Sequence, residues 1–518
     1  MTVYESPKPD IDIPAISITE ALFQGLDMDP ERVVVIDGPS GREMTAGTLK
    51  SDIRKLAGGL SERGYGKGTV TALMAPNIPE YVTVFHGVAY AGGTVTTINP
   101  TYTAYEVQKQ LKDAGAKLLI VPEMFLPTAK EAAQGTSVEL IAVIGGAEGE
   151  TSLTDLMGTA QEAQTPVDLE TDILVLPYSS GTTGMPKGVM LSHRNLVANV
   201  AQCSAFFTPK PGEKTIAFLP FFHIYGMTVL MNQYLSLGAA LVTMPRFDLE
   251  LFLKLVADHK PKMLYIVPPV AVGLAKHPLV DQFDTSSVER VMCGAAPLGG
   301  ELGDLCGKRL NAVMTQGYGM TELSPVSHAV PIDGPRSGSS GLTVPNCLSK
   351  VVDPETLEEK GPNEEGELWV KGPNVMLGYL NNAQATRETI TEDGWLRTGD
   401  LAIIDEDGYM FVRERVKELI KFKGFQVAPA ELEAELVGHD GIQDAAVLGK
   451  PDPEAGEVPV GFIVKAQGVE LTEDEVKAHL KGRLSSYKQL AEVRFVDEIP
   501  KSASGKILRR LLKDKLDG

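Results

Sequence analysis

Short apolar runs alternate with amphipathic stretches along most of the chain. Several runs are rich in Val, Ile and Leu and end in Gly, Pro or Ser, which is typical of buried strands. They are IAVIGG (141–146), DILVLPYSS (172–180), TIAFLP (215–220) and MLYIVPP (263–269). Capping boxes mark helix starts where Ser17 precedes Glu20 and Thr103 precedes Glu106. This alternation predicts an α/β fold, with a large N-terminal domain of layered sheets and helices.

The pattern changes from about Glu364 onwards. GELWVKG and DGYMFVRERVKELI are typical of short antiparallel strands in a more charged region. Helix and strand patterns then alternate through PAELEAELVGH, DAAVLG, VGFIVKA, EDEVKAHLKGRL and AEVRFVD. About one hundred residues of this kind suffice for a separate small domain. We therefore predict one domain over 1–414 and a smaller, mobile α+β domain over 415–518, with the boundary near Arg415–Lys417.

Composition excludes some classes of function. The 518 residues include 48 Lys and Arg against 68 Asp and Glu, and the net charge of −20 argues against broad nucleic-acid binding. The four cysteines, at 203, 293, 306 and 347, have neither zinc-site nor disulfide-framework spacing. No signal peptide, membrane-spanning apolar run or peroxisomal tripeptide is visible. A reducing cytoplasm without membrane attachment is therefore the expected setting.

The stretch YSSGTTGMPKG (178–188) leaves a predicted strand and is rich in small and hydroxyl residues. It is not a Walker A loop, because Pro186 occupies the place of the second Gly and Gly188 follows Lys187. The loop can still offer backbone N–H groups, hydroxyls and one ammonium to the outer phosphates of a nucleotide. The residues concerned are Ser179, Ser180, Gly181, Thr182, Thr183, Gly184 and Lys187. The alternative is a flexible turn between two strands.

This loop resembles the signature loop of the adenylate-forming superfamily, which includes acyl-CoA synthetases, adenylation domains of non-ribosomal peptide synthetases and firefly-type luciferases. Further motifs follow in the family's order. They are QGYGMTE (316–322), GWLRTGD (394–400), RVKELIKFKGFQVAPAELE (415–433) and PKSASGKILRR (500–510). Since the resemblance spans nearly the whole chain, it implies activation of a carboxylic acid with ATP.

The resemblance implies a nucleotide site. Glu322 would hold Mg²⁺, an ion that prefers oxygen ligands, and Thr321 would contact the α-phosphate as part of the catalytic machinery. Tyr318 would flank the adenine, and Asp400 would accept hydrogen bonds from the ribose hydroxyls. The other nucleotide-binding residues that the resemblance implies are Gly294, Ala295, Ala296, Gln316, Gly317, Gly319, Arg415 and Gln426.

The C-terminal motifs imply a catalytic lysine on a domain that rotates. Lys506 in SGK would neutralise charge between the carboxylate and the α-phosphate during adenylation. Lys417 matches the family's hinge position, where a few residues absorb the rotation. In the second pose Lys421, Lys423 and Gly424 would serve the thioester step with CoA.

The acyl pocket carries the closest resemblance to a subfamily, the 4-coumarate:CoA ligases. In PFFHIYGM (220–227), His223 would stand at the boundary between acyl and CoA tunnels and Tyr225 would face the acid. Gly319, Pro325 and Val326 would line the same pocket. A histidine at a strand end is otherwise more often a core residue.

The expected reaction converts a carboxylate and ATP to acyl-AMP and pyrophosphate, and then acyl-AMP and CoA to acyl-CoA and AMP. The favoured acid is 4-coumarate or a related aryl or hydroxycinnamic acid. The alternatives are a medium-chain fatty acyl-CoA synthetase, a luciferase-type oxidative enzyme, or a nucleotide-binding regulator that has lost the chemistry. Expected partners are the acid, ATP, Mg²⁺ and CoA, with no nucleic acid, and either a monomer or a homodimer fits the sequence.

Overall fold

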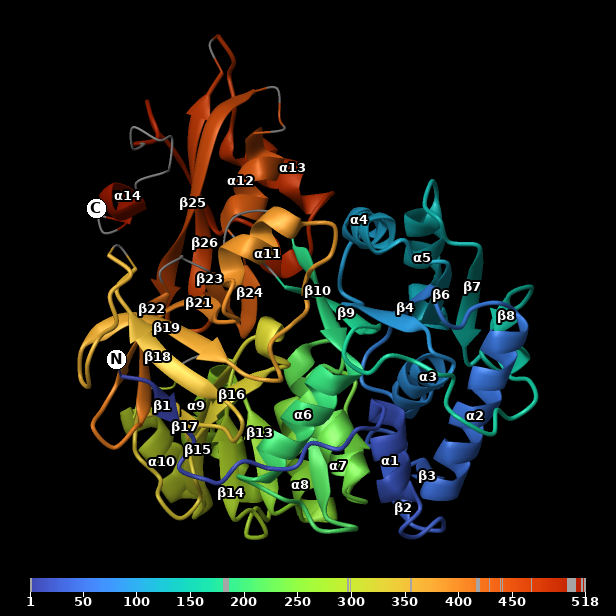
Figure 1. The fold of residues 1–518 in the computed structure, drawn as a ribbon. Coiled ribbons are helices and arrows are strands. Elements are labelled where there is room, and N and C mark those ends of the chain that lie inside the picture. The colour runs from blue at the N-terminus through green and yellow to red at the C-terminus, as the bar shows by residue number, and fades with distance from the viewer. Residues whose placement is uncertain are drawn as a thin grey trace. The chain divides into compact units, whose positions relative to one another are not determined.

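In the computed structural model, the chain folds into two compact units (Figure 1). The described residues are 2–179, 186–295, 298, 300–354, 356–415, 420–427, 429–437, 439, 441–466, 468–500, 509–513 and 516. Unit 1 comprises residues 1–100, 110–178 and 188–414, and unit 2 comprises 101–109, 179–187 and 415–518. The sequence predicted an uninterrupted domain over 1–414, so the two short segments 101–109 and 179–187 are where the division differs from that prediction.

An eight-stranded sheet forms one layer of unit 1. Its strands, in spatial order, are β20 (Gly378–Tyr379), β10 (Lys187–Ser192), β9 (Ile173–Ser179), β5 (Thr94–Ile98), β4 (Val70–Met74), β6 (Leu118–Pro122), β7 (Leu140–Ile144) and β8 (Thr151–Ser152). Strands β9, β5, β4, β6, β7 and β8 pair in parallel, which requires crossover helices.

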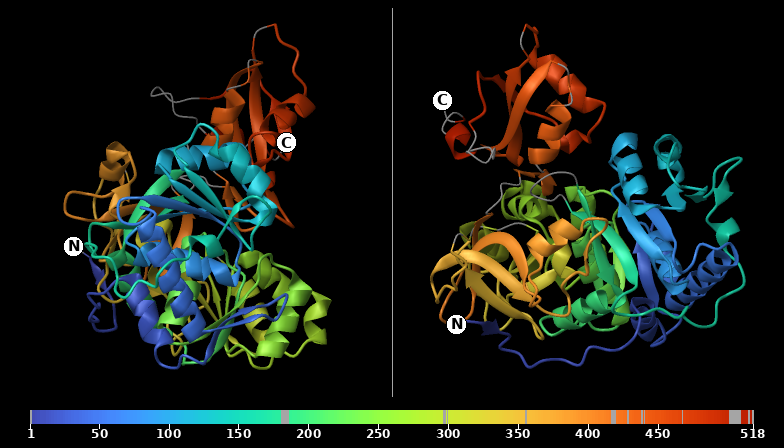
Figure 2. Two further views of the ribbon diagram at one scale, coloured as in Figure 1. Left: turned by 90° about the vertical axis from the view of Figure 1, so that its right-hand side faces the viewer. Right: turned by 45° about the horizontal axis from the view of Figure 1, so that its top comes forward.

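The crossover helices cover both faces of this sheet. Helix α3 (Pro79–Tyr90) connects β4 to β5, and α5 (Leu126–Ala133) connects β6 to β7 in the opposite direction along the sheet. Right-handed crossovers in opposite directions place their helices on opposite faces, and the views in Figures 1 and 2 agree with this placement. Strands β4 and β6 are therefore buried almost throughout, which explains their unbroken apolar runs.

Two further sheets complete the layered part of unit 1. The first has the order β11 (Lys214–Ala217), β12 (Ala240–Thr243), β2 (Val33–Asp37) and β3 (Glu43–Thr45). The second has the order β13 (Met263–Ile266), β14 (Arg290–Cys293), β15 (Val313–Gly319), β16 (Val326–Ala329) and β17 (Leu342–Thr343). The four strands predicted from apolar runs are confirmed as β7, β9, β11 and β13, although each predicted run extends past the strand's last residue.

The helices of these layers pack a common apolar core. They are α1 (Ile18–Leu26), α2 (Ala46–Glu62), α6 (His193–Ser204), α7 (Gln233–Ser236), α8 (Leu249–His259), α9 (Pro268–Lys276) and α10 (Gly300–Leu310). Large side chains such as Tyr81, Phe85 and Phe221 are fully buried in it. Ser17 and Glu20 form the predicted capping box at the start of α1. In the described part of the chain, no helix has both the length and the apolar character that a bilayer crossing requires.

An antiparallel sheet ends unit 1, with the order β1 (Tyr4–Glu5), β18 (Leu348–Val352), β19 (Glu365–Lys371), β21 (Leu396–Ile404) and β22 (Met410–Arg415). The short helix α11 (Ala383–Thr389) lies between β20 and β21 in the chain. The antiparallel strands predicted in GELWVKG and in DGYMFVRER are confirmed as β19 and β22.

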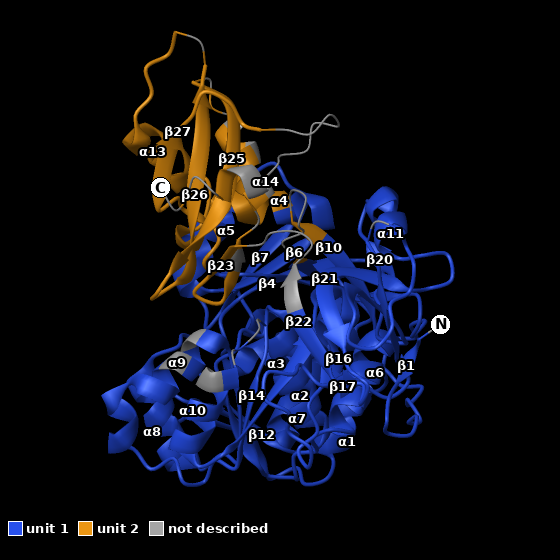
Figure 3. Ribbon diagram, turned by 90° about the vertical axis from the view of Figure 1, so that its left-hand side faces the viewer, with its two compact units in different colours: residues 1–100, 110–178, 188–414 blue, residues 101–109, 179–187, 415–518 orange. Residues whose placement is uncertain are grey.

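Unit 2 is a small α+β body (Figure 3). Its sheet consists of β24 (Phe425–Val427), β23 (Ile420–Phe422), β26 (Gly456–Lys465), β25 (Ile442–Asp452) and β27 (Glu492–Phe495). Its helices are α12 (Pro429–Val437), α13 (Glu473–Lys481) and α14 (Arg509–Lys513). Segment 101–109 contains the first residues of α4 (Ala104–Ala114), where the predicted capping box between Thr103 and Glu106 is confirmed.

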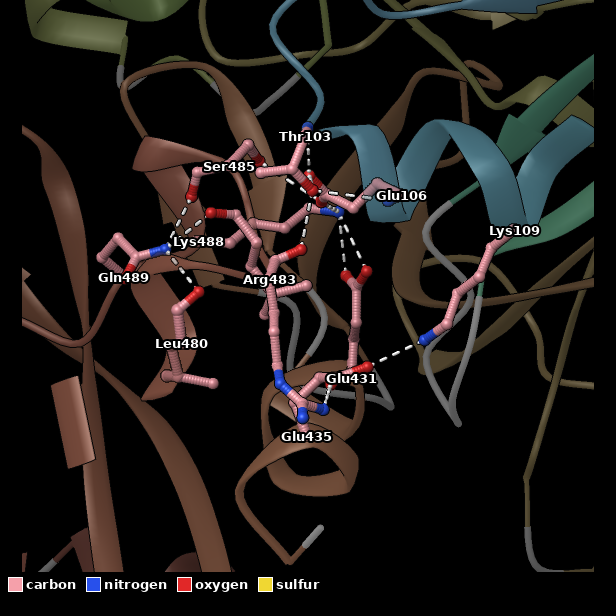
Figure 4. Close-up of polar contacts among 11 residues, drawn as sticks. Thr103, Glu106, Lys109, Glu431, Glu435, Leu480, Arg483, Ser485, Lys488 and Gln489 are labelled. Atoms are coloured by element: carbon pink, nitrogen blue, oxygen red, sulfur yellow. Dashed lines mark hydrogen bonds and ion pairs between the residues drawn. The ribbon is translucent and has the colours of Figure 1, made fainter. Parts of the chain in front are cut away.

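A buried charge cluster attaches segment 101–109 to the rest of unit 2 (Figure 4). The Lys488 side chain is only 2% exposed, and its Nζ lies 3.1 Å from Glu106 Oε1 and 3.0 Å from Glu431 Oε1. Thr103 Oγ1 donates to the Arg483 carbonyl oxygen at 2.7 Å. Burial raises the pKa of Glu431, with Lys488 acting in the opposite direction. One buried ammonium thus compensates two buried carboxylates.

We expect Lys488→Met to lower the free energy of unfolding of unit 2 by about 3–5 kcal/mol, because it leaves two carboxylates buried without their cation. Hydrogen exchange at the amides of β25 and β26, recorded as a function of urea concentration, measures this decrease in the free energy of unfolding.

Lys450→Met is the matched control, because Lys450 is 40% exposed and pairs with Glu492, whose side chain is 35% exposed. A pair at the surface contributes about 1 kcal/mol or less. Equal losses in the two variants would contradict the role of the buried cluster.

Candidate active site

The carboxyl ends of two neighbouring parallel strands gather several of the predicted nucleotide residues. Strand β14 ends at Cys293 and is followed by Gly294 and Ala295, while β15 ends in Tyr318 and Gly319. Because β13, β14 and β15 are parallel, these ends share one edge of the sheet, where ligands of open α/β sheets bind. Ala295 has a φ of +68°, a left-handed conformation that is uncommon for a residue with a side chain.

Gln316 supports this edge from within. Its Oε1 accepts a hydrogen bond from the Leu298 backbone N–H at 2.9 Å, and its Nε2 donates to the Leu298 carbonyl oxygen at 3.0 Å. The amide therefore holds the backbone of Leu298 against β15. Gln316 is one of the predicted nucleotide-binding residues, and its side chain lies at this edge of the sheet with both amide atoms bonded to Leu298.

Tyr225 brings the predicted acyl pocket to the same edge. A Cβ added to Gly294 would lie only 2.9 Å from Tyr225 Cε1, so a glycine is needed where this ring packs. The Tyr225 hydroxyl is buried and has no hydrogen-bond partner among the residues that the structure describes. Burial raises its pKa, which keeps the hydroxyl protonated. A buried, unpaired hydroxyl is costly unless a ligand supplies its partner.

His223 lies two residues before Tyr225, at the end of the loop that follows β11. Its side chain is exposed, and its Nδ1 accepts a hydrogen bond from the Tyr225 backbone N–H at 3.3 Å. Thr97 at the carboxyl end of β5 donates to the Phe222 carbonyl oxygen at 2.8 Å. This loop is therefore fixed to the eight-stranded sheet, and the π-helix Gly226–Asn232 follows it. π-Helical turns are rare in proteins, and those that occur are frequently found at functional sites.

A hydrogen bond between Tyr318 and Asp400 joins two of the predicted nucleotide residues. The Tyr318 hydroxyl donates to Asp400 Oδ2 at 2.6 Å, across 82 positions of sequence. Asp400 is only 3% exposed. The ring of His328 packs edge-on to Tyr318, and burial lowers the pKa of His328 to about 3, so the imidazole is neutral. A neutral imidazole therefore packs against the ring that donates to Asp400.

Glu322 has a partner that the sequence did not reveal. Its side chain is buried in the short helical turn Thr321–Leu323, and Oε1 accepts a hydrogen bond from the Tyr379 hydroxyl at 2.8 Å. Burial and the neighbouring Glu322 raise the pKa of Tyr379, so the hydroxyl remains a donor. Tyr379 lies in a Gly-Tyr pair 57 residues away, and no local sequence pattern indicates this contact.

Pro325 and Val326 follow the turn and are held by backbone contacts. A Cβ on Gly319 would lie 2.3 Å from the Pro325 carbonyl oxygen, so glycine is needed at this approach. Asn199 Oδ1 accepts from the Val326 N–H at 3.0 Å, and Asn199 Nδ2 donates to the Val326 carbonyl oxygen at 2.7 Å. Both predicted acyl residues therefore lie beside the candidate metal turn in fixed positions.

In unit 2, Lys421, Lys423 and Gly424 belong to a hairpin between β23 and β24. Lys423 and Gly424 both have positive φ, +49° and +84°, as a two-residue type I′ turn requires. The Lys421 N–H donates to Glu457 Oε2 at 2.8 Å, and Lys423 Nζ lies 5.5 Å from the centre of the Phe422 ring.

Several predicted residues lie outside the described residues. These are Ser180, Gly181, Thr182, Thr183, Gly184, Ala296, Lys417 and Lys506. Ser179 is the last residue of β9 and Lys187 the first of β10, so the predicted phosphate loop connects these strands. Arg415 ends β22 and Gln426 lies in β24, but their side chains are outside the description.

The donors of this site fit Mg²⁺ held together with a nucleotide. Among the described residues there is no group of three His, Cys, Asp or Glu side chains that could hold a metal alone. Mg²⁺ commonly binds one or two carboxylates and completes its shell with phosphate oxygens and water. Glu322, a buried carboxylate whose position Tyr379 fixes, supplies a ligand of that kind.

Comparison with known proteins identifies the family. A model of the AMP-binding enzyme family matches residues 22–380, and a model of the AMP-binding enzyme C-terminal domain matches residues 431–506. The chain belongs to the AMP-binding enzyme family. The two matches also correspond to the large N-terminal and small C-terminal parts of this AMP-binding enzyme.

Individual relatives indicate which type of reaction within the family this enzyme catalyses. 4-Coumarate–CoA ligase 3 of Oryza sativa subsp. japonica is 41% identical over 528 residues, which covers 100% of this chain and 95% of the relative. The structure of a double mutant of o-succinylbenzoate CoA synthetase (MenE) from Bacillus subtilis, bound with a product analogue, matches with a TM-score of 0.84 at 26% identity, covering 95% of this chain and 98% of that one. ATP-bound MatB from Rhodopseudomonas palustris matches with a TM-score of 0.71 at 28% identity, covering 96% and 99%. This AMP-binding enzyme is therefore an adenylate-forming acid:CoA ligase that binds ATP.

We expect Tyr318→Phe to weaken AMP binding about tenfold, because a hydrogen bond to the buried Asp400 carboxylate is lost and the carboxylate is less well placed. Isothermal titration with AMP measures the change.

Tyr409→Phe is the control, since the Tyr409 hydroxyl also donates a hydrogen bond, to the Gly334 carbonyl oxygen at 2.8 Å, but contacts none of the residues of this site described above. AMP affinity equal to that of the unaltered protein in both variants would refute a role of the Tyr318–Asp400 bond in nucleotide binding.

Proposed function

We propose that this protein converts 4-coumarate or a related aryl acid to its CoA thioester, through an acyl-adenylate. The observation that carries the choice of acid is the buried Tyr225 hydroxyl, packed against Gly294 and lacking a partner among the described residues. An acid with a ring hydroxyl can pair with this group, whereas an alkyl chain leaves it unpaired. The 41% identity to a plant 4-coumarate–CoA ligase supports the same choice.

The nucleotide is held so that its α-phosphate faces the acid. Asp400 accepts hydrogen bonds from the ribose hydroxyls, while Tyr318 flanks the adenine and fixes Asp400. Glu322 is the protein ligand of Mg²⁺, which supplies neutralising charge to the phosphates when bound. Thr321 adjoins Glu322 and contacts the α-phosphate. The loop Ser179–Gly184 with Lys187 binds the β- and γ-phosphates, which leave together as pyrophosphate.

The two half-reactions use different residues. In the first, a carboxylate oxygen of the acid attacks the α-phosphorus, the bond to pyrophosphate breaks, and the Lys506 ammonium offsets the charge that develops. In the second, the CoA thiolate attacks the acyl carbon and AMP leaves with the carboxylate oxygen. Lys417 is the hinge between the two poses, with His223 at the tunnel boundary and Lys421, Lys423 and Gly424 serving the thioester step. Arg415 and Gln426 contact the nucleotide.

The four buried, unpaired cysteines at 203, 293, 306 and 347 support the reducing cytoplasm predicted from the sequence. Their burial also keeps them from the thioester chemistry, because burial raises the pKa of Cys293 and of Cys347 and favours the thiol form.

We expect AMP and pyrophosphate as products, and kcat/KM for 4-coumarate about tenfold above that for cinnamate, since a polar partner is then supplied to Tyr225. Coupled pyrophosphate release across 4-coumarate, cinnamate, benzoate and octanoate measures both. Tyr225→Phe should make 4-coumarate and cinnamate equivalent. A preference for octanoate would instead indicate the medium-chain alternative, and ADP as product would contradict the mechanism.

A variant of the proposed catalytic lysine separates the two half-reactions. Lys506→Ala should abolish AMP release from free acid and ATP, but should retain most of the conversion of synthetic coumaroyl-adenylate and CoA to the thioester. Equal loss in both reactions would contradict the assignment of Lys506 to the first half-reaction.

A further inference from the structure

Strand β21 bulges at the residue that carries the candidate ribose carboxylate. Strands β19 and β21 pair antiparallel, with Glu367 opposite Leu401 and Trp369 opposite Arg397. Leu368 alone therefore faces the three residues Thr398, Gly399 and Asp400. Gly399 has a φ of +73°, which a residue with a side chain rarely adopts. A bulge of this kind bends the strand and redirects a side chain, here that of Asp400.

Hydrogen bonds from both strands hold the bulge. The Gly399 backbone N–H donates to Glu367 Oε1 at 2.9 Å. Thr398 Oγ1 donates to the Leu368 carbonyl oxygen at 2.7 Å and accepts from the Asp400 N–H at 3.1 Å. The bulge interrupts the hydrogen bonds between the two strands and leaves the Gly399 N–H without a backbone acceptor. The Glu367 carboxylate therefore supplies that acceptor.

The carboxylate of Glu367 is itself fixed on its other side. Its Oε2 accepts a hydrogen bond from Trp369 Nε1 at 2.9 Å. The Trp369 ring is buried, with Lys350 Nζ 5.2 Å and the Arg397 guanidinium carbon 4.8 Å from its centre. Both cations attract the ring and restrict its movement. Each carboxylate oxygen of Glu367 thus accepts one hydrogen bond. One donor is the indole N–H of Trp369, and the other is the backbone N–H of Gly399 in the bulge.

We propose that Glu367 is a positioning residue, which sets the direction of the Asp400 carboxylate and so determines how strongly the enzyme selects a nucleotide with intact sugar hydroxyls. It acts through the backbone of Gly399, one residue before Asp400, while the Trp369 indole binds the other carboxylate oxygen. The inference rests on the proposed function in one respect, namely that Asp400 receives the ribose hydroxyls.

The test compares kcat/KM for ATP with that for 2′-deoxyATP and 3′-deoxyATP in the full chain. The unaltered enzyme should favour ATP over at least one deoxy analogue by about tenfold or more, and Asp400→Ala should remove that preference. Glu367→Gln should reduce the preference several-fold while the KM for the acid stays unchanged. A merely structural role would lower activity with all three nucleotides alike and leave the preference intact, which would overturn the proposal.

A rescue variant probes the hydrogen-bond geometry. In Glu367→Gln one end of the amide is a donor and faces either the Gly399 N–H or the Trp369 N–H, which are donors too. Adding Trp369→Phe removes the indole donor, so the amide oxygen can return to Gly399 and the sugar preference should recover. Glu367→Ala offers no acceptor and should not be rescued by the same change. Recovery in the alanine background, or none in the glutamine background, would overturn the proposal.

Two further variants alter the bulge and its surroundings separately. Thr398→Val removes the other side-chain support of the bulge and should reduce the sugar preference as Glu367→Gln does. Glu359→Gln is the matched control, because it makes the same chemical change at a carboxylate that lies 3.1 Å from Lys350 Nζ. Glu359 makes none of the hydrogen bonds that hold the bulge, so this variant should leave the sugar preference unchanged. If Asp400→Ala keeps the preference of the unaltered enzyme while AMP is still formed, the positioning proposal fails and the ligase function stands.

Discussion

The hydrogen bond from the Tyr318 hydroxyl to Asp400 Oδ2 is the contact on which the candidate site depends. Tyr318 ends a strand of the mixed five-stranded sheet, and Asp400 lies in the antiparallel sheet that closes unit 1. Both sheets contribute side chains to one apolar core, and this hydrogen bond joins the ring predicted to flank the adenine to the carboxylate predicted to bind the ribose. Burying an unpaired carboxylate would be costly, so the tyrosine also makes the burial of Asp400 acceptable.

The same design recurs at the second carboxylate. Tyr379 donates to Glu322 as Tyr318 donates to Asp400, and in both cases a protonated phenol lies against a buried acid. Close backbone approaches complete the site, because Gly294 admits the Tyr225 ring and Gly319 admits the Pro325 carbonyl oxygen. The candidate site is therefore formed by close backbone approaches at glycines and by long-range hydrogen bonds that fix the positions of both carboxylates.

Local pattern and family resemblance predicted different parts of this picture. Strands such as β7 and β13 follow from apolar runs, and the capping box at Ser17 follows from three residues of spacing, because these features are local. The nucleotide residues came from motifs, not from periodicity. The roles of Tyr379 and Glu367 escaped both, since GELWVKG was interpreted only as a strand. Their partners lie 57 and 32 positions away, and only the register of folded strands brings them together.

In the proposed reaction, an oxygen of the acid itself attacks the α-phosphorus of ATP. The most direct measurement uses 4-coumarate labelled with ¹⁸O in both carboxylate positions, with mass spectrometry of the nucleotide and phosphate products after thioester formation. We expect AMP that carries one ¹⁸O and pyrophosphate that carries none. If instead pyrophosphate or phosphate carried the label and AMP or ADP did not, the acid would have attacked the β- or γ-phosphorus. That result would rule out the proposed reaction.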